Sequence, residues 1–533
     1  MRLAAHRVLR FAGGGIALLA CANLADAHGF GQRYDLPLPL SFYLLGAALA
    51  VSLSFAIVAL PGRRPATRRG KLDRAIAIGT LPRSAVVAMQ VIAAAALALV
   101  LSAGLLGHQS PFKNIAPVAI WVLWWVGLGL ASAFVGNVWP IINPWTALFA
   151  WAEAGWGRVT GRRLPLRLQY PERLGAWPAC LLFLAFAWLE LLAPDRDQPR
   201  VLALAAALYS LITLAGFAVF GRKAWLRNGE AFSLAFGLLG RFAPLRFDRR
   251  CQRRQVALRP PAFGLRAAAP LSPSLAAFAV LTLATVTVDG LLETPLWASF
   301  ATALLADGTG AIASGSYRLL GSALLIAGPA ALGALFVLAA AAMRETVVGA
   351  GRQAPTLAAL CGWFVPSLVP IAIAYHLAHY ISLLLIAGQF AIPLASDPFG
   401  FGWDLFGTTL YRVDISVIDA RTMWSVAVIA VVIGHIIALW LAHDTAQRLF
   451  EDERLATRSQ YPMVVPMIGY TALTLWILAQ PITEAGGRRH ARLPLRTPWV
   501  LGSVTRLDQP RRIPWPPTSC TASRNPAIPT RRH

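Results

Sequence analysis

The chain has 533 residues, of which 57% are hydrophobic and 14% charged, with a formal net charge of +24. Its mean hydropathy is +0.58. Water-soluble domains are not this apolar, and apolar runs of about 18 or more residues recur, so the composition indicates a bilayer protein. The basic residues lie in short loops between these runs, where they set membrane orientation, so the charge does not indicate nucleic-acid binding.

The N-terminal segment has the three-part layout of a secretory signal peptide. A basic stretch, 2–10, precedes an apolar run that ends in a small-x-small cleavage pattern at Ala27. Cleavage there makes 1–27 the signal peptide and His28 the first mature residue. An alternative is lipoprotein-type cleavage, which would make Cys21 the first mature residue.

Ten further apolar runs are long enough, or nearly so, to cross about 30 Å of hydrocarbon as helices. They cover 39–60, 84–106, 116–136, 177–193, 201–220, 274–291, 318–342, 355–391, 422–442 and 461–480. The sequence therefore predicts an all-α fold: a polytopic transmembrane helical bundle of about ten membrane helices, over 28–480, after a cleaved signal peptide.

Arginine-rich loops predict the orientation of this bundle. Signal cleavage places the new N-terminus outside, so the arginine-rich first loop, 62–83, is expected inside. Alternation then places four more arginine-rich loops inside: 154–176, 221–273, 343–354 and 443–460. The positive-inside rule therefore agrees with the signal peptide. We expect a multi-pass protein of the bacterial inner membrane with an extracytoplasmic mature N-terminus.

Three further segments are not expected to span the membrane. The tryptophan-containing segment 139–156 and the amphipathic segment 228–242 are expected to lie on the bilayer surface. The tail, 481–533, is basic, rich in Pro and Arg, and without apolar periodicity. We expect it to be disordered and assign it no function, because alternation would put it outside, where a dense basic run is unexpected.

Three histidines fall inside predicted hydrocarbon, where an ionisable side chain is costly and is a functional candidate. His376 and His379 lie at i and i+3 on one helix face. Their depth, about 22 Å below the outer surface, matches that of His435 on the next, antiparallel helix, at about 20 Å. We expect these three imidazoles to hold a divalent transition metal, Zn or Cu. The alternatives are hydrogen bonds to neighbouring helices, or kinks at Pro366 and Pro370 that invalidate the depth estimate.

A second, outward metal site is expected at His28 and His108. A mature N-terminal histidine offers an α-amine and an imidazole nitrogen, which together chelate copper-like metals. Asp35, Asp289 and Glu293 could join this site, or the last two could be helix-end acids that face water. The outer site would lie about 20 Å from the histidine layer, so no ion could use both.

The helix that carries His435 continues to His443 and Asp444. These residues come about two turns later, near the expected cytoplasmic boundary. We expect water to solvate both.

Several motifs occur in a characteristic order: 28–40 (HGFGQRYDLPLPL), 135–139 (VGNVW) with 143–145 (NPW), 374–380 (AYHLAHY), and 434–435 (GH) with 442–444 (AHD). Together they resemble a bacterial family of polytopic membrane proteins, many of which are called fenitrothion hydrolase. The likeness covers most of 28–480 and stops before the tail. It implies hydrolysis of an organophosphorus triester at the aryl–oxygen–phosphorus link, with release of a nitrophenol. It assigns no catalytic residues.

We therefore expect an integral membrane hydrolase in which a metal-bound hydroxide attacks the phosphorus of a small apolar substrate dissolved in the bilayer. Two other classes of function stay open. One is copper handling or transport, with His28 and His108 as the outer acceptor and the helical histidines as the pathway. The other is an oxidoreductase with haem between His376 or His379 and His435. The sequence gives neither the physiological substrate nor the protein partners.

Overall fold

The computed structural model of the chain describes residues 39–58, 75–161, 168–250, 253–266, 269–307, 312–450 and 452–480. All of them belong to one contact unit, Met1–Arg496. The predicted signal peptide with Cys21, His28 and Asp35, and the tail 481–533, lie outside the described residues.

Ten segments of the described chain are helical, long enough and apolar enough to cross a membrane. Their elements are α2 (Leu40–Val58); α4 (Arg83–Leu106); α5 (Ile115–Pro117), η3 (Val118–Gly127) and α6 (Leu128–Phe134); η4 (Glu172–Leu174) and α9 (Trp177–Leu191); α10 (Pro199–Phe220); α13 (Pro273–Leu292); α15 (Ser314–Gly349); α16 (Leu357–Phe364), η6 (Val365–Leu368), α17 (Val369–Ile386), η7 (Ala387–Phe390) and α18 (Ala391–Ser396); α19 (Ala420–Leu449); and α20 (Glu453–Ser459) with α21 (Tyr461–Leu478). The predicted all-α polytopic bundle is confirmed, because each predicted span overlaps one of these segments. The chain is a multi-pass membrane protein.

Shorter helices connect these spans: α7 (Trp139–Ile142), α8 (Pro144–Thr160), α11 (Arg222–Asn228), α12 (Ala231–Leu239) and α14 (Pro295–Leu305). The predicted surface location of 228–242 is wrong for α12, because Ala231, Phe232 and Phe236 are at most 1% exposed. Glu230 makes this burial possible. Its carboxylate caps α12 by accepting the backbone N–H groups of Phe232 and Ser233, and it also accepts hydrogen bonds from a tyrosine hydroxyl and an indole N–H.

The other predicted surface segment, 139–156, is divided. Trp139 and Trp145 are 3% and 4% exposed and belong to the main aromatic core, whereas Trp151 in α8 is exposed. The tryptophans in this stretch therefore serve two purposes. The earlier two pack inside the protein, and only the later part of the segment has the exposed indole expected of a surface anchor.

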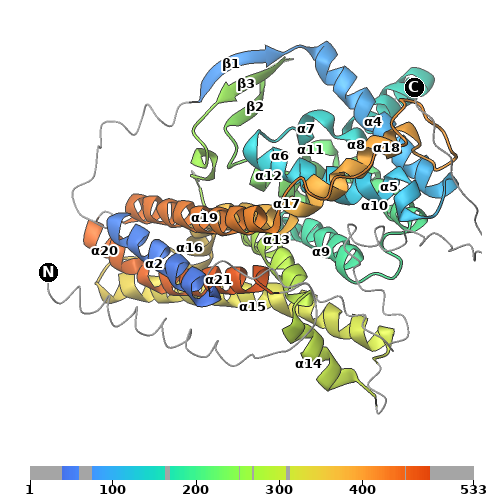
Figure 1. The fold of residues 1–533 in the computed structure, drawn as a ribbon. Coiled ribbons are helices and arrows are strands. Elements are labelled where there is room, and N and C mark those ends of the chain that lie inside the picture. The colour runs from blue at the N-terminus through green and yellow to red at the C-terminus, as the bar shows by residue number, and fades with distance from the viewer. Residues whose placement is uncertain are drawn as a thin grey trace, which may run out of the picture. The chain divides into compact units, whose positions relative to one another are not determined.

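A small antiparallel sheet, with strand order β1-β3-β2, lies beside the helices (Figure 1). Its strands are β1 (Ile76–Leu81), β2 (Leu245–Arg250) and β3 (Arg253–Leu258). The sequence analysis placed all three strands in loops. β1 pairs with β3, for example Ile76 with Leu258, although four helical spans separate them in the sequence. Such non-local pairing leaves little trace in local sequence patterns.

The long apolar segment that carries the two paired histidines is interrupted twice. The 3-10 turn η6, which contains Pro366, separates α16 from α17, and a second 3-10 turn, η7, follows α17. Proline removes a backbone donor, so the first break has a clear cause. The helix thus changes type at Pro366, one of the two positions at which a kink was the alternative, whereas Pro370 lies in the first turn of α17. α17 packs against α13, η3 and α19, while α2, α15, α19 and α21 lie side by side (Figure 1).

The contact between α17 and α19 depends on Gly434. A Cβ atom at this position would lie 2.5 Å from the Cβ of Ala374 and 2.8 Å from the carbonyl oxygen of Pro370. Small residues allow membrane helices to approach closely in this way.

Replacing Gly434 by valine should therefore destabilise the protein by about 1–3 kcal/mol, the usual cost of overpacking. The matched control is Gly469→Val in α21, where a Cβ would meet nothing within 4 Å. Thermal unfolding of the full-length protein in detergent should show a lower midpoint for Gly434→Val alone. Equal midpoints would contradict this account of the helix contact.

Candidate functional site

A buried acid–imidazole pair joins α13 to α17. Asp289, near the C-terminal end of α13, is 1% exposed, and its Oδ2 lies 3.0 Å from Nε2 of His379 in α17. The hydroxyl of Tyr380 donates to the same Oδ2 at 2.6 Å. A buried carboxylate is costly unless it is paired and hydrogen-bonded, so these two partners explain how α13 carries an acid within a membrane span.

The same tyrosine extends the network to a second acid. The Tyr380 hydroxyl oxygen lies 3.3 Å from Oε1 of Glu190 in α9, and this oxygen also accepts a hydrogen bond from Nε1 of Trp125 at 3.1 Å. One hydroxyl carries one proton, so it cannot fully serve both carboxyl groups at once. The two carboxyl groups are thus linked through a single exchangeable proton. Three spans, α9, α13 and α17, supply this buried network.

Trp125 comes from an unusual segment. Residues Val118–Gly127 form a π-helix, η3, from which Trp125 enters the main aromatic core and Trp124 packs against it. Sustained π-helix is rare, and π-helical turns occur frequently at functional sites. The Trp125 ring also packs edge-on against His376 with 5.4 Å between ring centroids.

His376 faces away from α19. Ala374 lies next to Gly434 of α19 and therefore marks the side of α17 that faces α19. His376 comes two residues later, which is a rotation of about 200° around the helix axis. The ring packs against Tyr380 with 4.8 Å between centroids, and its Nε2 is 3.3 Å from where a Cβ of Gly129 in α6 would lie. His376 is 5% exposed, and its Nε2 has no hydrogen-bond partner among the described residues.

His435 points instead toward α21. It is 1% exposed, and its ring centroid lies 6.3 Å from that of Tyr470. Its Nδ1 lies 2.8 Å from the carbonyl oxygen of Val431. A carbonyl only accepts, so Nδ1 carries the proton and the neutral ring keeps a lone pair on Nε2. That Nε2 has no partner in the described part of the chain.

The three helical histidines therefore have different polar surroundings, although His376 and His379 both pack against the ring of Tyr380. The lone pair of His435 has the chemistry of a metal ligand, but Nε2 of His379 is bonded to Asp289 and His376 lies on the far side of α17. Within the described ranges, no group of three or more His, Cys, Asp or Glu side chains is placed to hold a metal ion. The metal at His376, His379 and His435 stays a prediction that this geometry does not favour, and we derive no step through it.

The predicted position of Asp289 is wrong. It was expected either at an outer site about 20 Å from the histidines or facing water, yet it contacts His379 directly. The depth estimate assumed one straight helix over 355–391, whereas the chain breaks on both sides of α17. Glu190 was missed altogether. Asp289 and Glu190 are each the sole acid in their predicted spans, and an isolated intramembrane acid is itself a functional signal.

His108, one of the two expected outer ligands, is an exposed residue of the loop after α4. Its Nδ1 accepts the backbone N–H of Ser110 at 2.9 Å, and its own backbone N–H donates to the carbonyl of Phe399. With Nδ1 accepting, the neutral ring carries its proton on Nε2, so metal binding through Nε2 would require a tautomer change. His28 lies outside the described residues, so the outer copper site stays a prediction.

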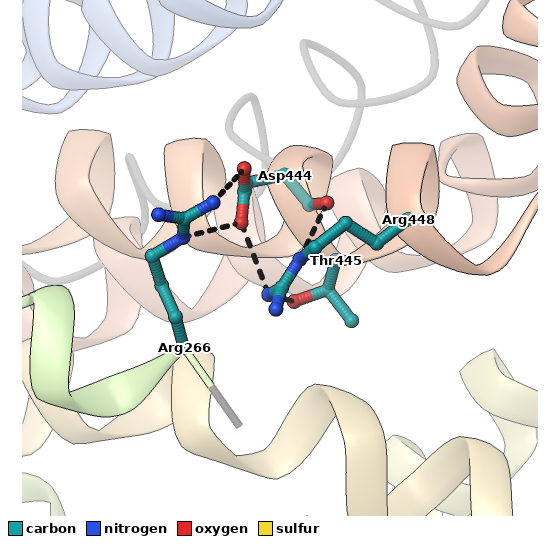
Figure 2. A network of polar contacts seen from close by, with 4 residues as sticks. All are labelled: Arg266, Asp444, Thr445 and Arg448. Carbon is teal, nitrogen blue, oxygen red and sulfur yellow. Dashed lines mark hydrogen bonds and ion pairs between the residues drawn. The ribbon is translucent and has the colours of Figure 1, made fainter. Parts of the chain in front are cut away.

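The expected solvation of His443 and Asp444 is wrong. They are 5% and 9% exposed. Nε and Nη2 of Arg266 donate to both oxygens of Asp444 at 2.9 and 3.1 Å, and Nη2 of Arg448 lies 3.0 Å from Oδ2 (Figure 2). Arg448 also contacts the hydroxyl of Thr445. The loop before α13 thus returns to α19, and its guanidinium replaces water as the partner of the carboxylate.

One more arginine, Arg259, stabilises this end of the bundle. Arg259 donates to the carbonyl oxygens of Gly240, Arg241 and Ala243 at 2.8–3.0 Å, which closes the chain after α12. Burial lowers the pKa of Arg241, and burial together with the nearby charge of Arg246 lowers that of Arg259. The Arg259 side chain, which donates to three backbone carbonyls, therefore has a structural role.

The chain matches no family model, and no characterised protein or solved structure shows significant similarity to it.

The Arg266–Asp444 and Arg246–Asp248 pairs provide a matched test of burial. Asp444→Asn leaves two guanidinium groups without their carboxylate and should destabilise the protein by about 3 kcal/mol. Asp248→Asn removes the partner of Arg246 in a far more exposed pair of similar length and should cost no more than about 1 kcal/mol. Chemical unfolding of both full-length variants in detergent measures the difference. Equal losses would show that burial does not strengthen the Asp444 cluster.

Proposed function

We propose that this chain is a bacterial inner-membrane protein, with its mature N-terminus outside, that moves protons in coupled transport of a small solute. The observation that carries the proposal is the network Glu190–Tyr380–Asp289–His379, which links three spans through hydrogen bonds of 2.6–3.3 Å. Chains of Asp, Glu and His inside a membrane bundle are typical of proton relays in pumps and transporters.

The geometry suits stepwise proton transfer. The hydroxyl of Tyr380 can give its proton to Oδ2 of Asp289 while it takes one from Glu190, so the tyrosine ends the step unchanged. The proton on Asp289 then passes to Nε2 of His379 along the 3.0 Å contact. Each step needs no movement larger than a hydrogen-bond exchange.

The charges of the site supply a reason for coupling. A protonated His379 balances the buried carboxylate of Asp289, and loss of that proton leaves the carboxylate uncompensated in a medium of low dielectric constant. The cost is relieved by a new proton or by a cationic solute. Binding of the two is therefore linked thermodynamically, as coupled transport requires.

Proton uptake by the full-length protein in liposomes tests this proposal. With a pH-sensitive dye inside and an imposed potassium diffusion potential, wild-type vesicles should acidify faster than empty ones. Asp289→Asn keeps the side-chain shape but cannot exchange the proton, so uptake should fall to the empty-vesicle rate. Glu345→Gln, which removes an exposed acid of α15, is the control and should match wild type. Uptake that Asp289→Asn leaves unchanged would refute the relay.

Hydrolysis of organophosphorus triesters is a second candidate. The observation in its favour is that Asp289 orients the imidazole of His379, the arrangement in which an imidazole acts as general base toward water. The resemblance to proteins called fenitrothion hydrolase points the same way, and an apolar triester would concentrate in the bilayer around these helices.

Nitrophenol release from fenitrothion by membranes that contain the full-length protein separates these ideas. If the acid–imidazole pair is the base, His379→Gln should abolish release, whereas His376→Gln should retain most of it because the hydrogen bond to Asp289 is made by His379. A shared metal would make both variants inactive at equal protein abundance. Release by neither the wild type nor the variants would remove the hydrolase proposal and leave the transport proposal untouched.

A further inference from the structure

The loop between α18 and α19, residues 397–419, presents large apolar side chains outward. Phe401, Leu405, Phe406 and Leu410 are 55%, 60%, 70% and 91% exposed. Burying one such side chain is worth about 1.5–3 kcal/mol, so presenting four of them to water would be costly. Contiguous exposed apolar surface marks an interaction site.

This exposure is built into the loop and does not reflect a lack of structure. The carboxylate of Asp397 accepts the backbone N–H groups of Phe401 and Gly402 at 2.9 and 2.7 Å, and the hydroxyl of Ser396 accepts that of Phe406 at 3.1 Å. Gly400 has a positive φ of 73°, and a Cβ there would lie 2.4 Å from the carbonyl oxygen of Lys113. The chain therefore turns tightly at fixed points and holds its apolar side chains outward.

The short helix α14 shows the same feature independently. Leu296, Phe300 and Leu304 recur every four residues and are 59%, 50% and 58% exposed, while Trp297 and Ala301 pack inward at 6% and 1%. The helix contains no charged residue. Its 11 residues extend about 16 Å, which is too short to cross the bilayer. One apolar face packs on the protein, so the other needs an apolar partner outside it.

Both elements lie on the same side of the membrane. α14 connects the sixth and seventh spans, and the 397–419 loop connects the eighth and ninth, so an even number of crossings separates them. The arginine distribution assigns this side to the outside. The spans that flank each element enter the bilayer directly beside it, which makes lipid the nearest apolar medium.

We propose that α14 and the 397–419 loop lie in the headgroup layer of the outer leaflet and insert Leu296, Phe300, Leu304, Phe406 and Leu410 into its lipid. The polar residues of the loop fit this placement. Hydrogen bonds from Ser416 lower the pKa of Asp414, and hydrogen bonds from Thr422 lower that of Asp419, so both acids stay ionised and keep their part of the loop in water. Because the loop carries acids, attraction to anionic lipid does not drive its insertion.

Spin-label accessibility in the full-length protein tests this placement. Labels are introduced as Leu410→Cys and Phe300→Cys, with Arg412→Cys as the matched control in the same loop, and the signal of the labelled parent chain is subtracted. Leu410, Phe300 and Arg412 are all exposed, so the labels leave the fold intact. In phosphatidylcholine liposomes, the ratio of collisions with oxygen to collisions with nickel ethylenediaminediacetate should be several-fold higher at 410 and 300 than at 412.

Three results would overturn the proposal. If the nickel reagent reaches 410 and 300 as freely as 412, these side chains project into water. If both reagents are excluded, protein covers the surface, either a partner or a second copy of the chain. If insertion requires phosphatidylglycerol, attraction to anionic lipid drives it, contrary to the charge of the loop. A lipid-like ratio at only one of the two positions would overturn the proposal for the other element.

Discussion

Placing an ionisable side chain inside hydrocarbon costs several kcal/mol, and in this protein the contacts of Asp289 offset part of that cost. Its carboxylate is 1% exposed and binds His379 and Tyr380, so α13 and α17 can pack only at the height and rotation that bring these groups together. Tyr380 adds Glu190 and thereby α9. One buried acid thus constrains three spans, and the network that satisfies it is also the strongest candidate for function. The physical requirement for stability and the capacity to move a proton have the same origin.

The same requirement, that each side chain has surroundings of matching polarity, is expected at the two membrane boundaries. At one end of α19, Asp444 is bonded by Arg266 and Arg448, which takes the place of the solvation expected for a helix end (Figure 2). At the boundary that we assign to the outside, α14 and the 397–419 loop expose apolar side chains in the described structure, and we propose that lipid covers them. The Asp444 carboxylate is thus matched by protein donors, whereas the exposed apolar side chains are left for the bilayer.

Because the three helical histidines do not share one ligand in this structure, both functional proposals rest on His379 and its acid partner. A pair of histidines at i and i+3 suggests one shared ligand, but here His379 turns to an acid on α13 while His376 packs against the indole of Trp125. An imidazole oriented by a carboxylate can carry a proton or act as a general base, and both proposals use this property. Neither requires His376, His379 and His435 to meet.

The sequence alone determined the ten spans, because a membrane helix satisfies its backbone hydrogen bonds within about four residues and must be apolar over its whole length. It also indicated the break at Pro366, since a missing backbone donor is a local property. Only the tertiary structure decided which polar groups meet. Asp289 and His379 are 90 residues apart, and β1 pairs with β3 across four spans. The buried helix α12 is capped by Glu230, which accepts from two donors on α7 and α10 and from two backbone N–H groups of α12 itself. Those contacts depend on how each helix is rotated, tilted and interrupted, and hydropathy and spacing carry no information about that rotation.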